Sequence, residues 1–403
     1  MTEHIMNRRI IRLCKTVAFI TEFATNMLAP LLISMRAEYH IGVRQSGILL
    51  SCLFAGCLIG CICCSHLLVR FDKIRLLRTF IPLLGVSGLF VALSPAFFIT
   101  AAMISLVGIF DRIVQITANA LPTELSDRES ASSINGVMAF NALGACCGLT
   151  FSGALVTFGF SWRAVYFLYF IAAMSAALLS ARIPHQVQRQ RQKPRNKELS
   201  VILRCSEFWL LFILMALYSG GESGISSWVV TYLVQEHSFT TFMSSAVSAL
   251  IWIGVFAGRA ACEKISRYIP AVRLELFLMP MAAASIIPVP FLSGKMIWLC
   301  AFLIGLSLSG IWTLAVSLVI DNSDFDNGNV LTASFICSCA GSSASTYIIG
   351  SIAEQLSMPA AIISDGSIFL IMLALFIFWL HFHKQNNAGT EKSIPLTSGP
   401  GMR

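Results

Sequence analysis

Twelve separate apolar stretches, each about 20 residues long and joined by short polar segments, dominate the chain. A helix rises about 1.5 Å per residue, so each stretch spans the roughly 30 Å of hydrocarbon in a bilayer. The predicted spans are residues 12–34, 45–68, 75–94, 97–119, 131–158, 161–182, 207–233, 240–263, 270–291, 295–320, 328–351 and 360–382. The sequence therefore predicts an all-α polytopic membrane protein with twelve transmembrane helices. The first stretch is too long for the apolar region of a signal peptide, so we expect it to be retained.

Composition and charge support this class and predict its orientation. Hydrophobic residues make up 56% of the chain and charged residues 12%, whereas about a quarter of a soluble domain is charged. Lys and Arg concentrate before the first span and in the joints after spans 2, 6 and 8. Because short loops rich in Lys and Arg stay in the cytoplasm, we expect a multi-pass protein of the cell membrane with both termini cytoplasmic. The net charge of +8 then reflects topology, and no nucleic-acid partner is expected.

The longest basic joint divides the predicted domains. We expect an N-terminal six-helix bundle over residues 1–183 and a cytoplasmic basic linker over 184–206. A C-terminal six-helix bundle follows over 207–385, and a disordered cytoplasmic tail over 386–403. The two halves echo one another, because the glycine pair of span 2 that precedes Arg70 recurs in span 8 as Gly254 and Gly258 before Arg267. Parallel repeats of this kind place a substrate site at mid-membrane between the halves.

Three observations argue against a metal site or an enzyme. Most of the 13 cysteines lie inside spans, where a small side chain packs well between helices, and we expect no metal and no cofactor. No phosphate-binding GxxxxGK[ST] loop is present. The run from Gly221 to Gly224 resembles the Gly-x-Ser-Gly pattern of rhomboid-type intramembrane proteases, but no later span carries a histidine base at mid-depth for Ser223. An intramembrane protease is therefore a minor alternative.

Ionisable side chains inside the first and fourth spans are candidates for the chemistry, because a charge at the bilayer centre costs at least about 2.5 kcal/mol. Glu22 lies one helical turn before Asn26 and on the same face. Span 4 carries a single polar stripe, with Asp111 beside it, made of Gly108, Arg112, Gln115 and Asn119. One alternative is a static ion pair of Arg112 with Glu22 or Asp111 that only fixes the helices.

The C-terminal half carries a second set of candidates. Tyr218, Glu222 and Ser226 form a stripe in span 7, and Trp312 in span 10 is a candidate for stacking on a substrate. We expect Glu22 or Glu222 to be the carboxylate that takes up and releases a proton. Trp162 and Asp365 lie near span ends, where the expected position is the membrane interface.

Several motifs resemble the major facilitator superfamily over essentially the whole of residues 10–383. The joint after span 2 keeps Arg70 of the family's gating motif and has Lys73 in place of its last Arg. Span 4 carries the family's Arg-x-x-Gln pattern as Arg112 and Gln115, and Trp162-Arg163 resembles its usual start of span 6. The resemblance implies two six-helix bundles and secondary active transport by alternating access. It also implies a small-molecule substrate, protons and the lipid bilayer as partners, and a monomer. In the family, the Arg of span 4 takes part in proton transfer or substrate binding.

Two branches of the family are both represented, so the direction of transport stays open. Span 5 is similar to the antiporter motif at Gly144, Gly148 and Gly153, which favours export of a drug, antibiotic or peptide-like toxin. The segment from Tyr218 to Trp228 and the pair Gly258-Arg259 are similar to sugar permeases, which favours proton-coupled uptake of a sugar or similar polar metabolite. We favour export. A substrate sensor with a transporter fold is a further alternative.

Overall fold

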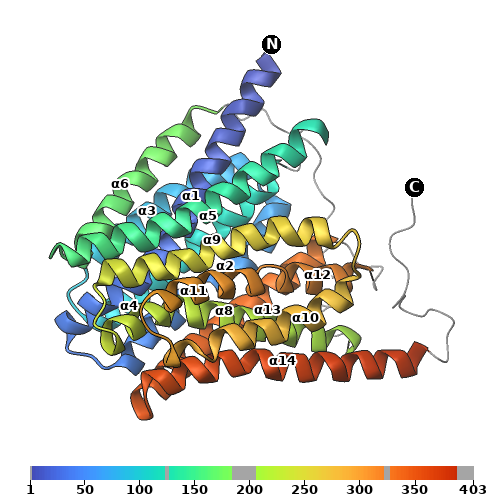
Figure 1. Cartoon of the computed structure of the whole chain (residues 1–403). Helices are drawn as coiled ribbons and strands as arrows, with labels where there is room; N and C mark the ends of the chain where they lie inside the picture. Colours follow the sequence, from blue (N-terminus) through green and yellow to red (C-terminus); the bar gives the residue numbers. More distant parts are fainter. Residues whose placement is uncertain (1, 123–126, 184–205, 322–326, 388–403) are drawn as a thin grey trace. The chain divides into compact units, whose positions relative to one another are not determined.

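A computed structural model describes residues 2–122, 127–183, 206–321 and 327–387, and the regular elements in those ranges are helices (Figure 1). The first half contains α1 (Thr2–Tyr39), α2 (Val43–Arg70), α3 (Lys73–Leu93), α4 (Phe97–Ala120), α5 (Asp127–Thr157) and α6 (Trp162–Ala181). The second half contains α8 (Ser206–Glu236), α9 (Thr241–Ile265), α10 (Ala271–Ile286), the 3₁₀ turn η2 (Val289–Phe291), α11 (Lys295–Leu308), α12 (Ile311–Asp321), α13 (Asn327–Gln355) and α14 (Met358–Asn387). The predicted all-α fold class is confirmed.

Among the described residues, 11 helical segments are long and apolar enough to cross a membrane. The remaining predicted span, residues 207–233, corresponds to α8, which is long enough but has a polar centre at Ser219–Gly224. The predicted linker over 184–206 and tail over 386–403 lie almost entirely outside the described residues.

The span predicted as one helix over 295–320 is instead broken. The helix α11 ends at Leu308 and α12 begins at Ile311, with Ser309 and Gly310 in a turn between them. At the break, the Tyr218 hydroxyl donates a hydrogen bond to the Leu308 carbonyl oxygen at 2.9 Å. Breaks of this kind in membrane helices are tolerated where another group satisfies the freed backbone. The predicted span over 295–320 is therefore present as one membrane-spanning segment, Lys295–Ile320, which contains a turn.

The described contacts divide the chain into two compact units. Unit 1 comprises Met1–Pro194 and Ser227–Ala249, and unit 2 comprises Arg195–Ser226 and Leu250–Arg403. Within unit 1, α1 packs mainly on α5, α2 on α4, and α3 on α4 and α6. Within unit 2, α10 packs on α11, α12 and α14, and α13 packs on α14.

The glycines predicted as packing positions lie where helices approach closely. A Cβ atom at Gly144 would lie 2.3 Å from the carbonyl oxygen of Phe19, and one at Gly148 would lie 2.7 Å from that of Phe23. Both glycines bring α5 directly against the backbone of α1, as small residues do in membrane helix contacts. The other three predicted glycines are equally close to a neighbour. A Cβ atom would lie 2.3 Å from Ser245 Oγ at Gly153, 2.4 Å from the Phe302 carbonyl oxygen at Gly254 and 2.3 Å from Ser309 Oγ at Gly258.

Candidate functional site

A chain of hydrogen bonds connects α1 to α4 inside unit 1. Gln115 Nε2 donates to Glu22 Oε1 at 2.7 Å, and Arg112 Nη1 donates to Gln115 Oε1 at 2.6 Å. Asn26 Nδ2 donates to the Glu22 backbone carbonyl at 2.9 Å and to Glu22 Oε2 at 3.4 Å. The structure thus brings together four residues that the sequence placed on two separate helix faces.

The Gln115 amide lies between the carboxylate and the guanidinium and bonds to both. Gln115 and Asn26 are 6% and 8% exposed, whereas Glu22 and Arg112 are half-buried. Hydrogen bonds to ionised groups are roughly twice as strong as neutral ones, and aligned bonds polarise one another in a medium of low dielectric constant. A change in the charge of Glu22 is therefore transmitted through Gln115 to Arg112.

Asp111 and Asn119, which were predicted with this group, lie apart from the chain of hydrogen bonds. Adjacent residues of a helix point about 100° apart, so Asp111 leaves α4 in a different direction from Arg112. It is 1% exposed and lies within electrostatic reach of the Tyr169 hydroxyl. Asn119 Oδ1 has no hydrogen-bond partner among the described residues.

The predicted stripe of span 7 lies inside unit 2. The Tyr218 hydroxyl donates to Glu222 Oε1 at 2.8 Å and shares its proton with the Leu308 carbonyl at the helix break. Ser226 is buried one turn further along α8. Arg259, of the Gly258-Arg259 pair similar to sugar permeases, is exposed and lies within electrostatic reach of Glu222. Glu222 therefore faces a hydroxyl donor and a cation.

Serine hydroxyls and one tryptophan connect helices elsewhere in unit 2. Ser223 donates to Ser342 Oγ at 2.7 Å, and Ser342 donates to the Ser219 carbonyl at 2.9 Å, so these serines join α8 to α13. The hydroxyl proposed as a protease nucleophile thus contacts another serine. Trp312 Nε1 donates to Ser338 Oγ at 2.9 Å, and the indole of Trp312 lies in the α12–α13 contact.

The joint between α2 and α3 is hydrogen-bonded to the end of α4. Lys73 Nζ donates to the Ala120 carbonyl oxygen at 3.2 Å. Asp72 caps α3 by accepting a bond from the Arg75 backbone N–H at 3.2 Å. Arg70, the last residue of α2, is exposed. The two predicted gating residues therefore differ in position, since Lys73 contacts a neighbouring helix and Arg70 faces outward.

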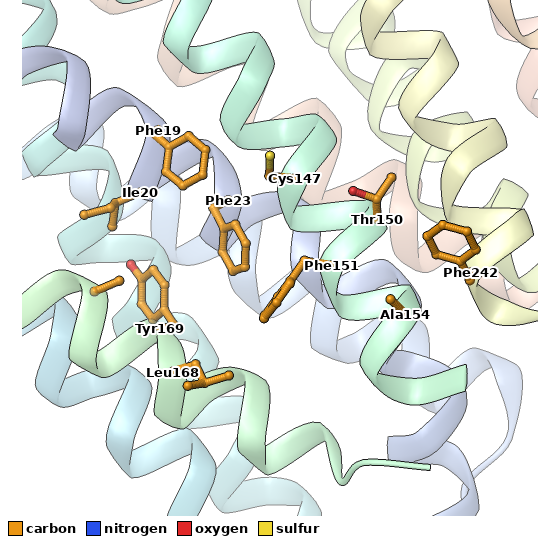
Figure 2. Close-up of a pocket in the computed structure, with 11 residues that line it drawn as sticks. Phe19, Ile20, Phe23, Cys147, Thr150, Phe151, Ala154, Leu168, Tyr169 and Phe242 are labelled. Carbon is orange, nitrogen blue, oxygen red and sulfur yellow. The ribbon is translucent and has the colours of Figure 1, made fainter. Parts of the chain in front are cut away.

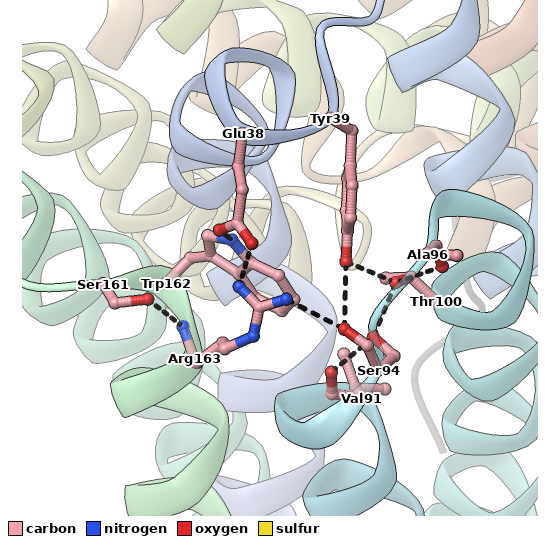
Figure 3. A network of polar contacts seen from close by, with 9 residues as sticks. All are labelled: Glu38, Tyr39, Val91, Ser94, Ala96, Thr100, Ser161, Trp162 and Arg163. Carbon is pink, nitrogen blue, oxygen red and sulfur yellow. Dashed lines mark hydrogen bonds and ion pairs between the residues drawn. The ribbon is translucent and has the colours of Figure 1, made fainter.

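A polar network that the sequence did not predict ties four helix ends together in unit 1 (Figure 3). Glu38, near the end of α1, forms an ion pair with Arg163 and accepts a hydrogen bond from Trp162 Nε1 at 2.6 Å. Arg163 also donates to the Ser94 carbonyl at 2.8 Å, and Ser94 Oγ lies 2.6 Å from Thr100 Oγ1. The prediction that Trp162 is an interfacial anchor was wrong, because its side chain is 1% exposed. The sequence signal for this network was the Trp162-Arg163 pair, because the indole N–H and the guanidinium group both require a hydrogen-bond acceptor.

A cavity of about 590 Å³ lies in unit 1 between α1, α5, α6 and α9 (Figure 2). Aromatic rings dominate its lining, and Phe23 and Tyr169 are stacked with their centroids 6.5 Å apart. The Thr150 hydroxyl donates to its own helix, at the Cys146 carbonyl. The lining residues are Phe19, Ile20, Phe23, Cys147, Thr150, Phe151, Ala154, Leu168, Tyr169, Ala172 and Phe242, so no predicted substrate-binding residue lines it.

Two buried acids of unit 2 were absent from the predicted site. The side chain of Asp365 is 0% exposed, and its Oδ1 would lie 2.2 Å from a Cβ atom at Gly224, so this acid packs against α8. Glu275, in α10, is also 0% exposed. The available signal was an acid within the apolar run around Leu274 and Leu276. In the described residues, no group of three or more His, Cys, Asp or Glu side chains is placed to hold a metal ion.

Comparisons with known proteins place this architecture in a family. The model of the Major Facilitator Superfamily matches residues 16–346. The chain is similar to the crystal structure of a bacterial homologue of the human lysosomal transporter Spinster, in an inward-facing and occupied conformation. That likeness has a TM-score of 0.77 and 14% identity and covers 92% of this chain and 96% of the other. A mutant of the nucleoside transporter NupG matches with a TM-score of 0.71 and 9% identity over 93% of this chain and 99% of the other.

No curated protein matches the chain. The structural likenesses, at 14% and 9% identity, show a shared fold. Because the family model covers well over half of the 403 residues, the chain belongs to the major facilitator superfamily of membrane transporters.

Proposed function

We propose that the protein is a proton-coupled secondary transporter that exports a small organic solute by alternating access. The hydrogen-bonded chain of Glu22, Gln115 and Arg112 carries this proposal. It joins a titratable carboxyl group to a permanent cation across two helices of one unit. A transporter driven by protons requires such a pair, because the proton must alter the binding of the solute.

Protonation of Glu22 changes every bond in this chain. An ionised carboxylate accepts hydrogen bonds at both oxygens, whereas a protonated one carries a donor and has lost its charge. The bonds from Gln115 and Asn26 then weaken, and Arg112 loses the polarised amide that faces it. A solute with a cationic or hydrogen-bond-donating group competes with the proton for Glu22, which is the exchange that export requires.

The packing of α5 supports export. Gly144 and Gly148, which belong to the motif similar to antiporters, contact the backbone of α1 at Phe19 and Phe23. These contacts flank Glu22 in the sequence of α1. A movement of α5 against α1 would therefore act on the helix that carries the proposed coupling carboxylate.

Uptake of a sugar or similar polar metabolite is the second candidate. It is favoured by Tyr218 and Glu222, which hydrogen-bond at 2.8 Å in unit 2 within the segment similar to sugar permeases. A carboxylate with a neighbouring hydroxyl suits the recognition of solute hydroxyl groups. In this mechanism a proton and the solute move together, and Glu222 replaces Glu22 as the coupling group.

Solute flux into proteoliposomes with an imposed pH gradient tests both candidates. A panel of cationic drugs, peptides and sugars is compared with and without a protonophore. We expect Glu22→Gln to lose concentrative transport but to keep energy-independent exchange, because glutamine preserves size but cannot cycle a proton. Glu222→Gln should behave this way if uptake is correct. The exposed Glu263, whose side chain is 69% accessible, provides the control Glu263→Gln.

Two results would count against the proposal. Wild-type transport that ignores the protonophore contradicts proton coupling. A solute gradient that both Glu22→Gln and Glu222→Gln still build, and that the protonophore collapses, places the coupling group elsewhere, with Asp111 next in line.

A further inference from the structure

Glu275 is buried in unit 2 without any hydrogen bond. Its side chain is 0% exposed, and neither carboxyl oxygen has a hydrogen-bond partner among the described residues. An ionised carboxylate in such surroundings would forfeit its hydration without compensation, and proteins neutralise such groups. Buried polar groups are nearly always hydrogen-bonded, so this exception requires an explanation.

The surroundings of Glu275 are the break between α11 and α12. Gly310 leaves room there for the sulfur of Cys262, which would lie 2.5 Å from a Cβ atom at that position. Glu275 is within electrostatic reach of both the Cys262 thiol and the Tyr218 hydroxyl. Tyr218 already donates to Glu222 at 2.8 Å. Tyr218 therefore hydrogen-bonds to one carboxyl group and lies within electrostatic range of a second.

The charged groups near this pair of acids come from α9, from α10 and from the helices packed on α10. Arg259 lies within electrostatic reach of Glu222 and of Tyr218. The helix α10 itself carries the exposed Arg273. In the part of the chain whose side chains are described, the helices packed on α10 carry Lys295 at the first residue of α11 and, in α14, Asp365 at Gly224 and His381. Asp321 is the last residue of α12. Because neither carboxyl oxygen of Glu275 has a hydrogen-bond partner among the described residues, we expect this buried acid to be neutral.

We propose that Glu275 is a proton-binding site of unit 2, which exchanges its proton with water and is coupled to Glu222 through the Tyr218 hydroxyl. In the arrangement described, Glu275 holds the proton and Glu222 is ionised. When the O–H bond of Glu275 breaks, the proton passes to water and the negative charge stays on the carboxylate. A phenol has a single proton to donate. The new carboxylate then competes with Glu222 for the hydroxyl of Tyr218.

This competition couples proton release to the helix break. Tyr218 also bonds to the Leu308 carbonyl at the end of α11, so moving its hydroxyl towards Glu275 removes a partner from that carbonyl. Glu275 lies in the second turn of α10, which begins at Ala271 after the basic joint, close to the end of the helix that is predicted to be cytoplasmic. The role of Glu275 in transport rests on the proposed function, whereas proton binding at Glu275 does not.

Infrared difference spectroscopy of the full-length protein in lipid nanodiscs, titrated with pH, tests the proposal with protons as the probe. A protonated carboxyl group without hydrogen bonds gives a carbonyl band at unusually high frequency. Asp365 is also buried without a hydrogen-bond partner among the described residues, so it contributes a band of the same kind. We expect Glu275→Gln to remove the component of the band that Asp365→Asn retains, and the control Glu263→Gln to leave both components unchanged. The band should remain in Glu222→Gln. A band that persists unchanged in Glu275→Gln would overturn the proposal.

A second variant tests the coupling between Glu275 and Glu222, and a third covers the case in which Glu275→Gln does not fold. In Tyr218→Phe, ionised Glu275 loses its prospective donor, so we expect the titration midpoint of the band to rise by about one pH unit, a tenfold change in proton affinity. An unchanged midpoint overturns the coupling to Glu222. If Glu275→Gln does not fold, Glu275→Asp takes its place in the test. The carbonyl band of this variant should differ in frequency from the band of the wild type. Loss of protonophore sensitivity in flux assays, with the band intact, would contradict only the proposed transport function.

Discussion

At the scale of residues, Gln115 connects the proposed coupling carboxylate to the cation. Its amide accepts from Arg112 at 2.6 Å and donates to Glu22 at 2.7 Å. An amide suits this position because it offers both a donor and an acceptor, which no carboxylate or ammonium group does. The identity of Arg112 matters as well, since a guanidinium presents its donors in a rigid plane.

Arg112→Lys should lower transport of the solute found in the flux assay by at least about tenfold, equivalent to ~1.4 kcal/mol. Lysine keeps the charge but replaces the planar fork with a single flexible ammonium group, which does not hold the Gln115 amide in the same orientation. Expression and the melting temperature should be unchanged.

The matched control for that substitution is Arg267→Lys, at a side chain that is 70% accessible and that, among the described residues, pairs with its neighbour Glu263 one turn earlier. It should transport like the wild type. Full activity in Arg112→Lys would remove Arg112 from the mechanism.

At the scale of elements, glycines set the distance between α1 and α5. The carbonyl oxygens of Phe19 and Phe23 occupy the space that side chains at Gly144 and Gly148 would need. Lipid offers no hydrophobic drive for helix association, so close van der Waals packing at small residues supplies it. The α1–α5 pair is also the most extensive helix contact of unit 1.

Gly144→Ala should destabilise the protein by roughly 1–3 kcal/mol, the usual cost of overpacking, because its Cβ atom would lie 2.3 Å from a backbone oxygen that cannot move alone. Gly136→Ala is the matched control in the same helix, since its Cβ atom would meet only the flexible end of Lys15. Thermal unfolding in detergent should show a lower melting temperature for the first variant alone. Equal melting temperatures for the two variants would show that the α1–α5 contact relaxes freely.

At the scale of the whole molecule, the chain forms two compact units, and α8 and α9 each contribute to both. Each unit carries its own carboxyl group with polar partners, Glu22 in unit 1 and Glu222 in unit 2. The orientation of the chain in the membrane is still a prediction from the distribution of Lys and Arg.

Impermeant maleimide labelling of single-cysteine variants tests that orientation in a background without the native cysteines. Gln190→Cys, in the basic joint, should react only after the cells are opened, because the positive-inside rule places this joint in the cytoplasm. Phe160→Cys, between α5 and α6, should react in intact cells. Labelling of position 190 from outside would overturn the topology.

The sequence by itself determined the properties that lie along one helix. The spans were predictable because the length of an apolar run is a local quantity, and the twelve-span family followed from them. The pairing of Glu22 with Asn26 and of Arg112 with Gln115 followed from helical periodicity, which places residues three and four apart on one face.

Only the tertiary structure decided which faces meet. Gln115 and Glu22 are 93 positions apart, and Arg163 and Glu38 are 125 apart. Periodicity shows that a helix has a polar face but not which other helix that face contacts. The burial of Glu275 and Asp365 and the break at Ser309–Gly310 likewise depend on packing partners from other helices. The sequence placed Glu275 within an apolar run but could not show its burial, because burial and hydrogen-bond satisfaction are properties of the assembled helices.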